Sequence, residues 1–541
     1  MESFRNNATA GSQELNLWSG MVIRVKRRLR ILISLLLITL TTTMMMIHRR
    51  SLLNYLQLLA VGYRYASSSS SSSVVSSSSS SIGRRLHLKQ VLIIHRHGDR
   101  TPITPMNDVE FWQSTLPDSS VLEGIARGTS LLRTRGHVPN NIHGAAGKGP
   151  FGQLTMLGLL QMVKLGERLR GELVGFDEEY NLFTPEDLHP RRMKVKSTDF
   201  PRTIQSVQAM LTGLFDNDHH NNNKQEQMMI EIDLRDTNTY LIPDPQPRQH
   251  SLQLGLEKHL ADRSHLRERE IGLQDLARRV TDELEGYLGE GADGISFGIG
   301  EEKEDTTTNI AATIVVGQQQ QRPRRRPPLA WAQMCEILVC LHSRSLLPST
   351  LSKEDVTTVS NHVAWRWFEN LGHPILAKAA MSKFANELID DMRRRVNEDK
   401  EVGGIVATAA SPDHLHNKVA VPKLCIYSAH DSTLIGLLCV LQLERPTMWP
   451  EYGSALKVEL LREDNETAAD GGDDSKYWVR FSLNGQVLRC KVNKAGDDVG
   501  DDESEASMVS FDRLVDMINL DYDDKQLKYS WSNKNELLSQ N

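Results

Sequence analysis

The stretch Val91–Pro102, "VLIIHRHGDRTP", decides the fold. Its first four residues are apolar, and an uninterrupted apolar run is typical of a strand that is buried on both faces, as in a parallel sheet. The run leads directly into two histidines, two arginines, an aspartate and a glycine, and it ends at a proline. In open α/β sheets, ligands bind where the strands release their carboxyl ends. The stretch therefore predicts a buried strand that delivers charged side chains to a binding site.

Two later segments repeat this transition from strand to polar residues to helix. "RMKVKSTDF" (192–200) alternates like a strand and precedes "PRTIQSVQAMLTGLF" (201–215), a helical pattern with Pro201 suited to its first turn. "PKLCIYSAHD" (422–431) is an apolar strand that leads into the helical "STLIGLLCVLQL" (432–443). With the helical pattern of residues 155–173, the order predicts an α/β fold. We expect a mixed, largely parallel sheet flanked by helices.

The remaining segments suggest how the domain is organised. Between residues 229 and 400 the signals are mostly helical, which predicts a helical cap lobe inserted into an α/β core formed by 86–215 and 400–541. Tracts of low complexity interrupt the domain and are expected to be surface insertions. They lie near 216–228, 317–328, 463–475 and 496–505. His219 and His220 stand in the first tract, where we expect a solvated loop and no metal site, because no second ligand cluster accompanies them.

The charge of the chain is unevenly distributed. The net charge of the 541 residues is −6, but residues 1–98 hold 13 Lys/Arg against 2 acids, or +11, so the remainder carries −17. An acidic body argues against a nucleic-acid partner, which requires clustered cations. Five cysteines without a CxxC pair are expected to be buried thiols, although Cys335 and Cys340 are near enough in sequence to form a bridge.

Residues 1–85 are expected to be a targeting or anchor segment. They combine basic clusters, an apolar run of 17 residues (31–47) and a serine tract (66–82) that is expected to be a flexible linker. The scarcity of acids favours a mitochondrial transit peptide. The alternative is a secretory signal or a membrane anchor formed by 31–47, with membrane association through it. Two glycosylation sequons, at Asn7 and Asn465, support this alternative.

The polar residues at the three strand ends point to one kind of ligand. Arg96, Arg100 and Arg202 converge there with His97 and His430. An arginine in the first turn of a helix, such as Arg202, opposes the helix dipole unless an anion lies between them. Several guanidinium groups together with two histidines predict a compact, multiply charged anion, and phosphate is the natural candidate.

The motif "RHGDRTP" (96–102), followed far downstream by "AHD" (429–431), resembles the signature of the histidine acid phosphatases, a branch of the histidine phosphatase superfamily. This signature is Arg-His-Gly-x-Arg-x-Pro, with five fixed positions in seven residues. The segments 152–170 and 196–215 are similar to the family pattern in order and spacing. Within the family, "WPEYGSALKVELLRE" (449–463) is similar to the mitochondrial lysophosphatidic acid phosphatases.

The resemblance implies a metal-independent phosphatase that uses no cofactor. It implies that His97 is the nucleophile that forms a phosphohistidine, and that Asp431 is the general acid. It also implies that four residues bind the phosphate oxygens: Arg96, Arg100, Arg202 and His430. Two neighbours of the nucleophile, Asp99 and His95, are expected to have structural roles, Asp99 as a hydrogen-bond acceptor within the loop.

Three functions remain in play at this stage. The first is an acid phosphatase for phosphate monoesters, with lysophosphatidic acid as a substrate suggested by the resemblance. The second is an inositol-polyphosphate phosphatase of the same superfamily. The third is a catalytically silent membrane protein that only binds phosphate-containing partners. The presence of both His97 and Asp431 weighs against the third.

Overall fold

The computed structural model describes residues 85–133, 149–177, 181–215, 229–235, 264–292, 327–372, 374–405, 420–446, 449–463, 476–490 and 507–519. The chain comprises two units, 1–82 and 83–541, and all the described residues belong to the second. Several sequence predictions therefore lie outside the described residues. These are the targeting segment 1–84 with its apolar run 31–47, both sequons, the tracts 216–228, 317–326, 464–475 and 496–505, and the pair His219 and His220.

A nine-stranded mixed sheet forms the centre of the described region. Its order is β2-β4-β3-β5-β1-β6-β7-β8, and β9 pairs with β7. The first five strands in this order run parallel, and the others pair antiparallel. The prediction of a mixed, largely parallel sheet flanked by helices is confirmed. The strands are β1 (Leu86–Arg96), β2 (Thr129–Arg133), β3 (Met193–Thr198), β4 (Ile230–Arg235), β5 (Leu424–Ala429), β6 (Ala455–Glu463), β7 (Lys476–Leu483), β8 (Gln486–Val487) and β9 (Met508–Ser510).

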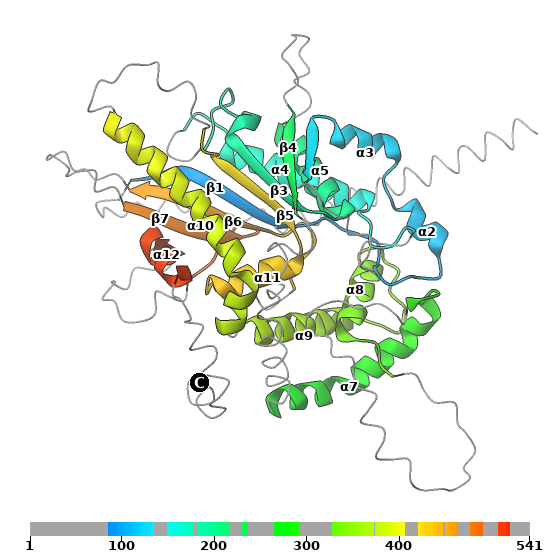
Figure 1. The fold of residues 1–541 in the computed structure, drawn as a ribbon. Coiled ribbons are helices and arrows are strands. Elements are labelled where there is room, and N and C mark those ends of the chain that lie inside the picture. Colours follow the sequence, from blue (N-terminus) through cyan, green and yellow to red (C-terminus); the bar gives the residue numbers. More distant parts are fainter. Residues whose placement is uncertain are drawn as a thin grey trace, which may run out of the picture. The chain divides into compact units, whose positions relative to one another are not determined.

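Helices cover both faces of this sheet (Figure 1). On one face, α3 (Ser119–Ala126), α4 (Met156–Leu173) and α5 (Pro201–Phe215) enclose an apolar core with β1, β3, β4 and β5. On the other face, α10 (Pro374–Ile405), α11 (Asp431–Val440) and α12 (Phe511–Asn519) enclose a second core. In Figure 1, α10 crosses in front of the sheet and α4 lies behind it. Coverage on both faces explains why Val91 to Ile94 are all apolar.

The two helices α4 and α5 form where the sequence predicts them. One stripe of α4 is buried, formed by Met162, Leu165, Leu169 and Leu173, and α5 begins at Pro201 as expected. Glycines allow the two helices to cross closely, since a Cβ on Gly166 would lie 2.0 Å from the carbonyl oxygen of Met210. A Cβ on Gly213 would lie 2.1 Å from the carbonyl oxygen of Val163. The close crossing brings the first turn of α5 to the edge of the sheet where β1 ends.

A third apolar cluster lies in the helical lobe, formed by α7 (Ser264–Leu284), α8 (Trp331–His342) and the first part of α9 (Lys353–Leu371), with α2 (Val109–Ser114) packed against it. The expected lobe boundaries, 229–400, need correction at both ends. Residues 230–235 form β4, whose Ile230, Ile232 and Leu234 are buried in the sheet core. At the other end, α10 packs on the sheet, with Phe384 against Tyr427 (ring centroids 5.1 Å apart).

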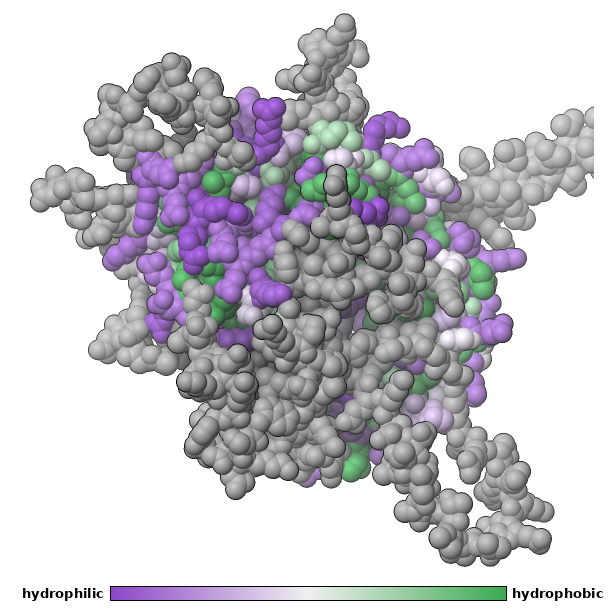
Figure 2. Space-filling view, viewed as in Figure 1, coloured by the Kyte–Doolittle hydropathy of each residue, from purple (hydrophilic) through white to green (hydrophobic). Residues whose placement is uncertain are grey.

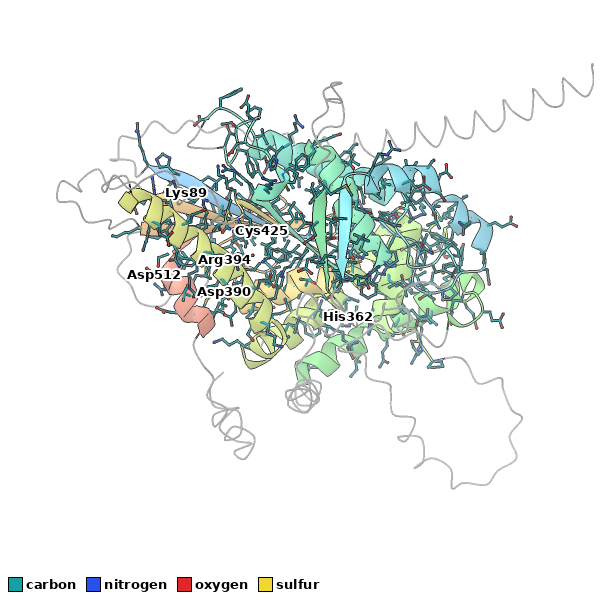
Figure 3. The ribbon with its side chains drawn as sticks, turned by 45° about the horizontal axis from the view of Figure 1, so that its top comes forward. Lys89, His362, Asp390, Arg394, Cys425 and Asp512 are labelled. Carbon is teal, nitrogen blue, oxygen red and sulfur yellow. The ribbon has the colours of Figure 1, made fainter. Side chains whose placement is uncertain are left out.

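Polar residues lie on the outside of the described region, and the cysteines lie inside it. Figure 2 shows hydrophilic residues gathered over α10, whose Asp390 and Arg393 form an exposed ion pair. All five cysteines are free and buried, as expected, and Figure 3 places Cys425 within the sheet and His362 among the helices of the lobe. None of the helices described here combines the length and apolar character that crossing a membrane requires.

Candidate active site

The three predicted strand ends meet at one edge of the sheet. The strands β3, β5 and β1 are neighbours and run parallel, with Arg96 opposite Ala429 and Ser197 opposite Ser428. His97, His430 and the turn before α5 follow the carboxyl ends of these strands and therefore lie side by side. The rings of His97 and His430 lie 5.7 Å apart, edge to face. The structure thus gathers residues that are more than 300 positions apart in the chain.

The loop that follows β1 lies directly against α4. A Cβ on Gly98 would lie 2.3 Å from the carbonyl oxygen of Gly158, and one on Gly158 would lie 2.1 Å from the carbonyl oxygen of Asp99. Two hydrogen bonds fix this contact: the amide of Asp99 donates to Gln161 Oε1 (2.9 Å), and the amide of Thr155 donates to the carbonyl of Asp99 (3.0 Å). Only glycine fits at either position, so the loop after β1 is held against α4 by contact between backbones.

Replacing Gly158 with alanine is expected to lower the free energy of unfolding by about 1–3 kcal/mol, because the added methyl group forces the loop and α4 apart. Gly171 is the matched control on the same helix, since a Cβ there meets nothing within 4 Å. There the Gly171→Ala change is expected to raise stability by about 0.5–1 kcal/mol. Urea denaturation of both variants measures the difference, and equal stabilities would contradict the close contact.

His97 is a neutral imidazole with one nitrogen available for chemistry. Its Nδ1 lies 2.8 Å from the carbonyl oxygen of Gly98, and because a carbonyl only accepts, Nδ1 carries the proton. Burial, with the positive charges of Arg202 and Arg96, holds the pKa of His97 well below its ordinary value. The ring is therefore unprotonated at Nε2, which leaves a lone pair there even in acidic solution.

Three buried guanidinium groups surround this imidazole. Arg96, Arg100 and Arg202 are each at most 5% exposed. The Nη2 of Arg96 pairs with Asp431 Oδ2 at 2.9 Å, and the Nη1 of Arg100 pairs with Glu336 Oε2 at 2.9 Å. The Nε atoms of Arg96 and Arg100 are buried without a hydrogen-bond partner among the described residues.

Arg202 extends from the first turn of α5. Burial, with the charge of Arg100, lowers the pKa of Arg202 to about 9, so it remains a cation at neutral pH. Its guanidinium lies 4.6 Å from the ring centre of Phe200 and donates to the carbonyl of Gly152 at 3.4 Å. Three buried guanidinium groups therefore surround one imidazole. A bound anion would compensate their positive charge.

His430 and Asp431 stand at the start of α11. His430 Nε2 is hydrogen-bonded to Thr198 Oγ1 at the end of β3 (3.1 Å). Burial and Arg202 lower the pKa of His430 to about 3, so the ring is neutral. The Asp431 side chain is 22% exposed. Burial alone would raise its pKa, but Arg96, His430 and the amide of Ser432 together outweigh this effect, and the pKa of Asp431 is lowered. Asp431 is therefore ionised in the ligand-free protein.

The structure adds supporting residues that the sequence analysis missed. Glu336 of α8 accepts from Arg100 and from the amides of Ile103 and Thr104, each at 2.9 Å. The Tyr452 ring lies 4.1 Å from the Arg96 guanidinium. One signal was available for Glu336: an acid inside the otherwise apolar helix "MCEILVC" requires a buried partner.

Asp99 and His95 take the structural places expected of them. The Asp99 carboxylate is buried and accepts from Thr155 Oγ1 (2.6 Å) and Arg344 Nη2 (2.5 Å), which ties the loop to α4 and to the end of α8. His95 lies within β1, and burial lowers its pKa to about 4, so it stays uncharged. Within the described ranges, no three His, Cys, Asp or Glu side chains are grouped in a way that could hold a metal ion.

The described region belongs to the α/β class, and the charged loop after β1 and the His-Asp pair at the start of α11 meet at the carboxyl ends of its parallel strands. A sequence model of the histidine phosphatase superfamily (branch 2) matches residues 87–484, and the chain belongs to this family. Over 412 residues the chain is 26% identical to counting factor 60 of Dictyostelium discoideum, which covers 74% of this chain and 80% of that protein.

Other relatives match a shorter segment. The chain is 35% identical over 142 residues to lysophosphatidic acid phosphatase type 6 of Bos taurus, which covers 24% of this chain and 32% of that enzyme. It is 29% identical over 132 residues to human lysosomal acid phosphatase, which covers 24% of this chain and 22% of that one. Among solved structures, Hafnia alvei phytase in complex with myo-inositol hexakis sulphate aligns with a TM-score of 0.45 and 12% identity, over 80% of this chain and 96% of that one.

Proposed function

We propose that this protein is an acid phosphatase that hydrolyses phosphate monoesters through a phosphohistidine intermediate. The observation that carries the proposal is His97: a buried, neutral imidazole whose Nδ1 is committed to a carbonyl, set among three buried guanidinium groups. A nucleophile requires a lone pair, and a phosphoryl group requires positive charge around its oxygens. Both requirements are met by the same small set of residues.

The first step forms the intermediate. The Nε2 lone pair of His97 attacks phosphorus in line with the ester oxygen, a P–N bond forms and the P–O bond breaks. The leaving oxygen takes the proton of Asp431, so an alcohol departs and Asp431 becomes a carboxylate. Arg96, Arg100 and Arg202, with His430, bind the non-bridging oxygens and stabilise their charge in the transition state.

The second step releases phosphate. The Asp431 carboxylate takes a proton from a water molecule, the water oxygen attacks phosphorus, and the P–N bond breaks with its electrons returning to Nε2. Inorganic phosphate leaves, and both His97 and Asp431 regain their starting states. No net proton is lost from the two residues over the cycle.

Asp431 is ionised in the free protein, but a general acid must carry a proton. Binding of the substrate phosphate supplies the change that this role requires. Burial raises the pKa of Asp431, and it is lowered overall only because several nearby groups, of which Arg96 is the strongest, together outweigh burial. A bound phosphate competes for the same guanidinium and adds negative charge nearby, and both effects raise the carboxyl pKa. A monoester that binds as its monoanion brings the proton that Asp431 then donates.

The scheme predicts that kcat/KM for an alkyl phosphate is highest in acid. The reactive complex holds one proton shared between Asp431 and a phosphate whose second pKa is about 6. Because the pKa of His97 is strongly lowered, acid does not disable the nucleophile. Above pH of about 6 the rate should fall about tenfold per pH unit as that proton is lost. Steady-state rates from acidic to alkaline pH measure this, and a rise through neutrality would contradict the scheme.

For the physiological substrate, we propose lysophosphatidic acid. Its support is the 35% identity over 142 residues to a lysophosphatidic acid phosphatase. The full chain should be offered lysophosphatidic acid, glycerol 3-phosphate as the same head group without the acyl chain, and myo-inositol hexakisphosphate. We expect lysophosphatidic acid to be turned over fastest, because buried methylene groups strengthen binding. Equal rates would defeat the lipid proposal, faster turnover of the inositol ester would favour an inositol-polyphosphate phosphatase, and no turnover would favour a silent phosphate-binding protein.

For the leader, we propose that residues 1–85 direct the protein to mitochondria. The support is their composition, which is rich in arginine and serine and holds only two acids, Glu2 and Glu14. Imaging the full chain with a fluorescent tag at its C-terminus tests this. Secretory-pathway staining would favour the alternative of a signal or anchor formed by 31–47.

A further inference from the structure

A short segment before β6, residues 449–453, contacts three residues of the proposed site. The indole Nε1 of Trp449 donates to Asp431 Oδ2 (3.1 Å). The carbonyl of Pro450 accepts from Arg96 Nη1 (2.5 Å), and the amide of Gly453 donates to the carbonyl of His97 (3.0 Å). Only the Trp449 contact reaches a group that changes its protonation state in the proposed reaction.

The two oxygens of Asp431 are held differently. Oδ1 accepts from the amide of Ser432 at 2.8 Å. Oδ2 accepts from two donors, the cationic Arg96 (2.9 Å) and the neutral indole of Trp449 (3.1 Å). A guanidinium favours the ionised carboxylate strongly and is also the group that a bound phosphate attracts. A neutral N–H can still donate to the C=O oxygen of a protonated carboxyl.

From this geometry we propose that Trp449 is a positioning residue that keeps the carboxyl of Asp431 in place while it loses and regains its proton. The inference rests on the proposed function, because it assigns Trp449 a role only through the general acid. Arg96 holds the carboxyl in the ligand-free protein, and Trp449 continues to hold it when phosphate draws the guanidinium away.

Trp449 is itself supported by the helical lobe. Its ring lies edge to face with Trp367 of α9, with the ring centroids 6.0 Å apart. Both tryptophans pack against the sheet core and the lobe core, at the place where the two clusters meet. The position of the indole is therefore set by packing and does not depend on its hydrogen bond to Asp431.

The test compares esters that need the proton to different degrees. General acid catalysis contributes about 10²–10⁴-fold for a poor leaving group, and far less for nitrophenolate, which departs readily as an anion. For Trp449→Phe, we expect kcat/KM for glycerol 2-phosphate to fall by about tenfold, a part of that contribution, and kcat/KM for 4-nitrophenyl phosphate to fall by less than about twofold. Trp478→Phe is the matched control, since its Nε1 donates to Glu463 between β7 and β6, and neither rate should change.

Each outcome decides between the alternatives. Equal losses on both esters, or no loss on either, would overturn the positioning role. If the wild-type protein hydrolyses neither ester, the proposed function itself fails. Should the phenylalanine variant not fold, β-(3-benzothienyl)alanine at position 449 keeps the shape of the indole and lacks its N–H. It should show the same selective loss, and an unchanged ratio of the two rates would again overturn the proposal.

Discussion

Replacing His97 with alanine is expected to lower kcat for 4-nitrophenyl phosphate by roughly 10⁴-fold or more, because the covalent route then has no nucleophile. The remaining guanidinium groups would still bind the ester, so KM should change far less than kcat. Initial rates measured with the full chain at acidic pH provide the test. His342→Ala is the control, since His342 is exposed at the end of α8, and its rate should match the wild type.

Rapid quenching adds a direct test of the intermediate. Wild-type protein mixed with a ³²P-labelled ester should carry label that survives base and is lost in acid, as a P–N bond is. The His97→Ala variant should carry none. Labelling that persists in this variant would move the nucleophile elsewhere, and turnover at the wild-type rate would remove His97 from the reaction.

The change Asp431→Asn is expected to lower kcat/KM for glycerol 2-phosphate by about 10²–10⁴-fold, because an amide has no proton to give to the departing oxygen. For 4-nitrophenyl phosphate the loss should be much smaller. The dependence of rate on the basicity of the leaving group should therefore steepen. Rates for a series of aryl and alkyl phosphates measure this slope.

Two controls isolate the loss of the proton in this variant. Asp390→Asn changes an exposed carboxylate on α10, which pairs only with Arg393 in the described contacts, and should leave every rate unchanged. Urea denaturation checks folding, because removing the Asp431 charge leaves the buried Arg96 without its ion-pair partner. An unchanged slope in a folded Asp431→Asn variant would exclude this residue as the acid.

Much of the sheet and the gathering of the candidate site residues could be predicted because their signals are local. Each strand end carries its own polar residues within a few positions, and the parallel order of β3, β5 and β1 brings them together. The four apolar residues from Val91 predicted a buried strand, and Pro201 predicted the start of a helix. Neither prediction depended on residues far away in the chain. The missed strand β4 shows the limit, since six alternating residues directly after a tract of low complexity give a weak signal.

The supporting residues could not be predicted, because their partners lie far away in the chain. Glu336 and Arg100 are separated by 236 positions, and nothing near either residue indicates the other. In the sequence, Trp449 is an ordinary apolar residue before a proline. Only the structure shows that its indole Nε1 donates a hydrogen bond to Asp431. Tertiary packing decides such pairs, and a single sequence contains no record of that packing.

The carboxylate of Glu336 also limits how the protein can be engineered. It belongs to α8 in the lobe, yet it receives the guanidinium of Arg100 and two backbone amides from the loop that begins at His97. Truncation of the lobe would leave these three donors without their acceptor. A chimera that takes its lobe from another member of the family must therefore carry an acceptor at this position, whatever substrate preference is being transferred.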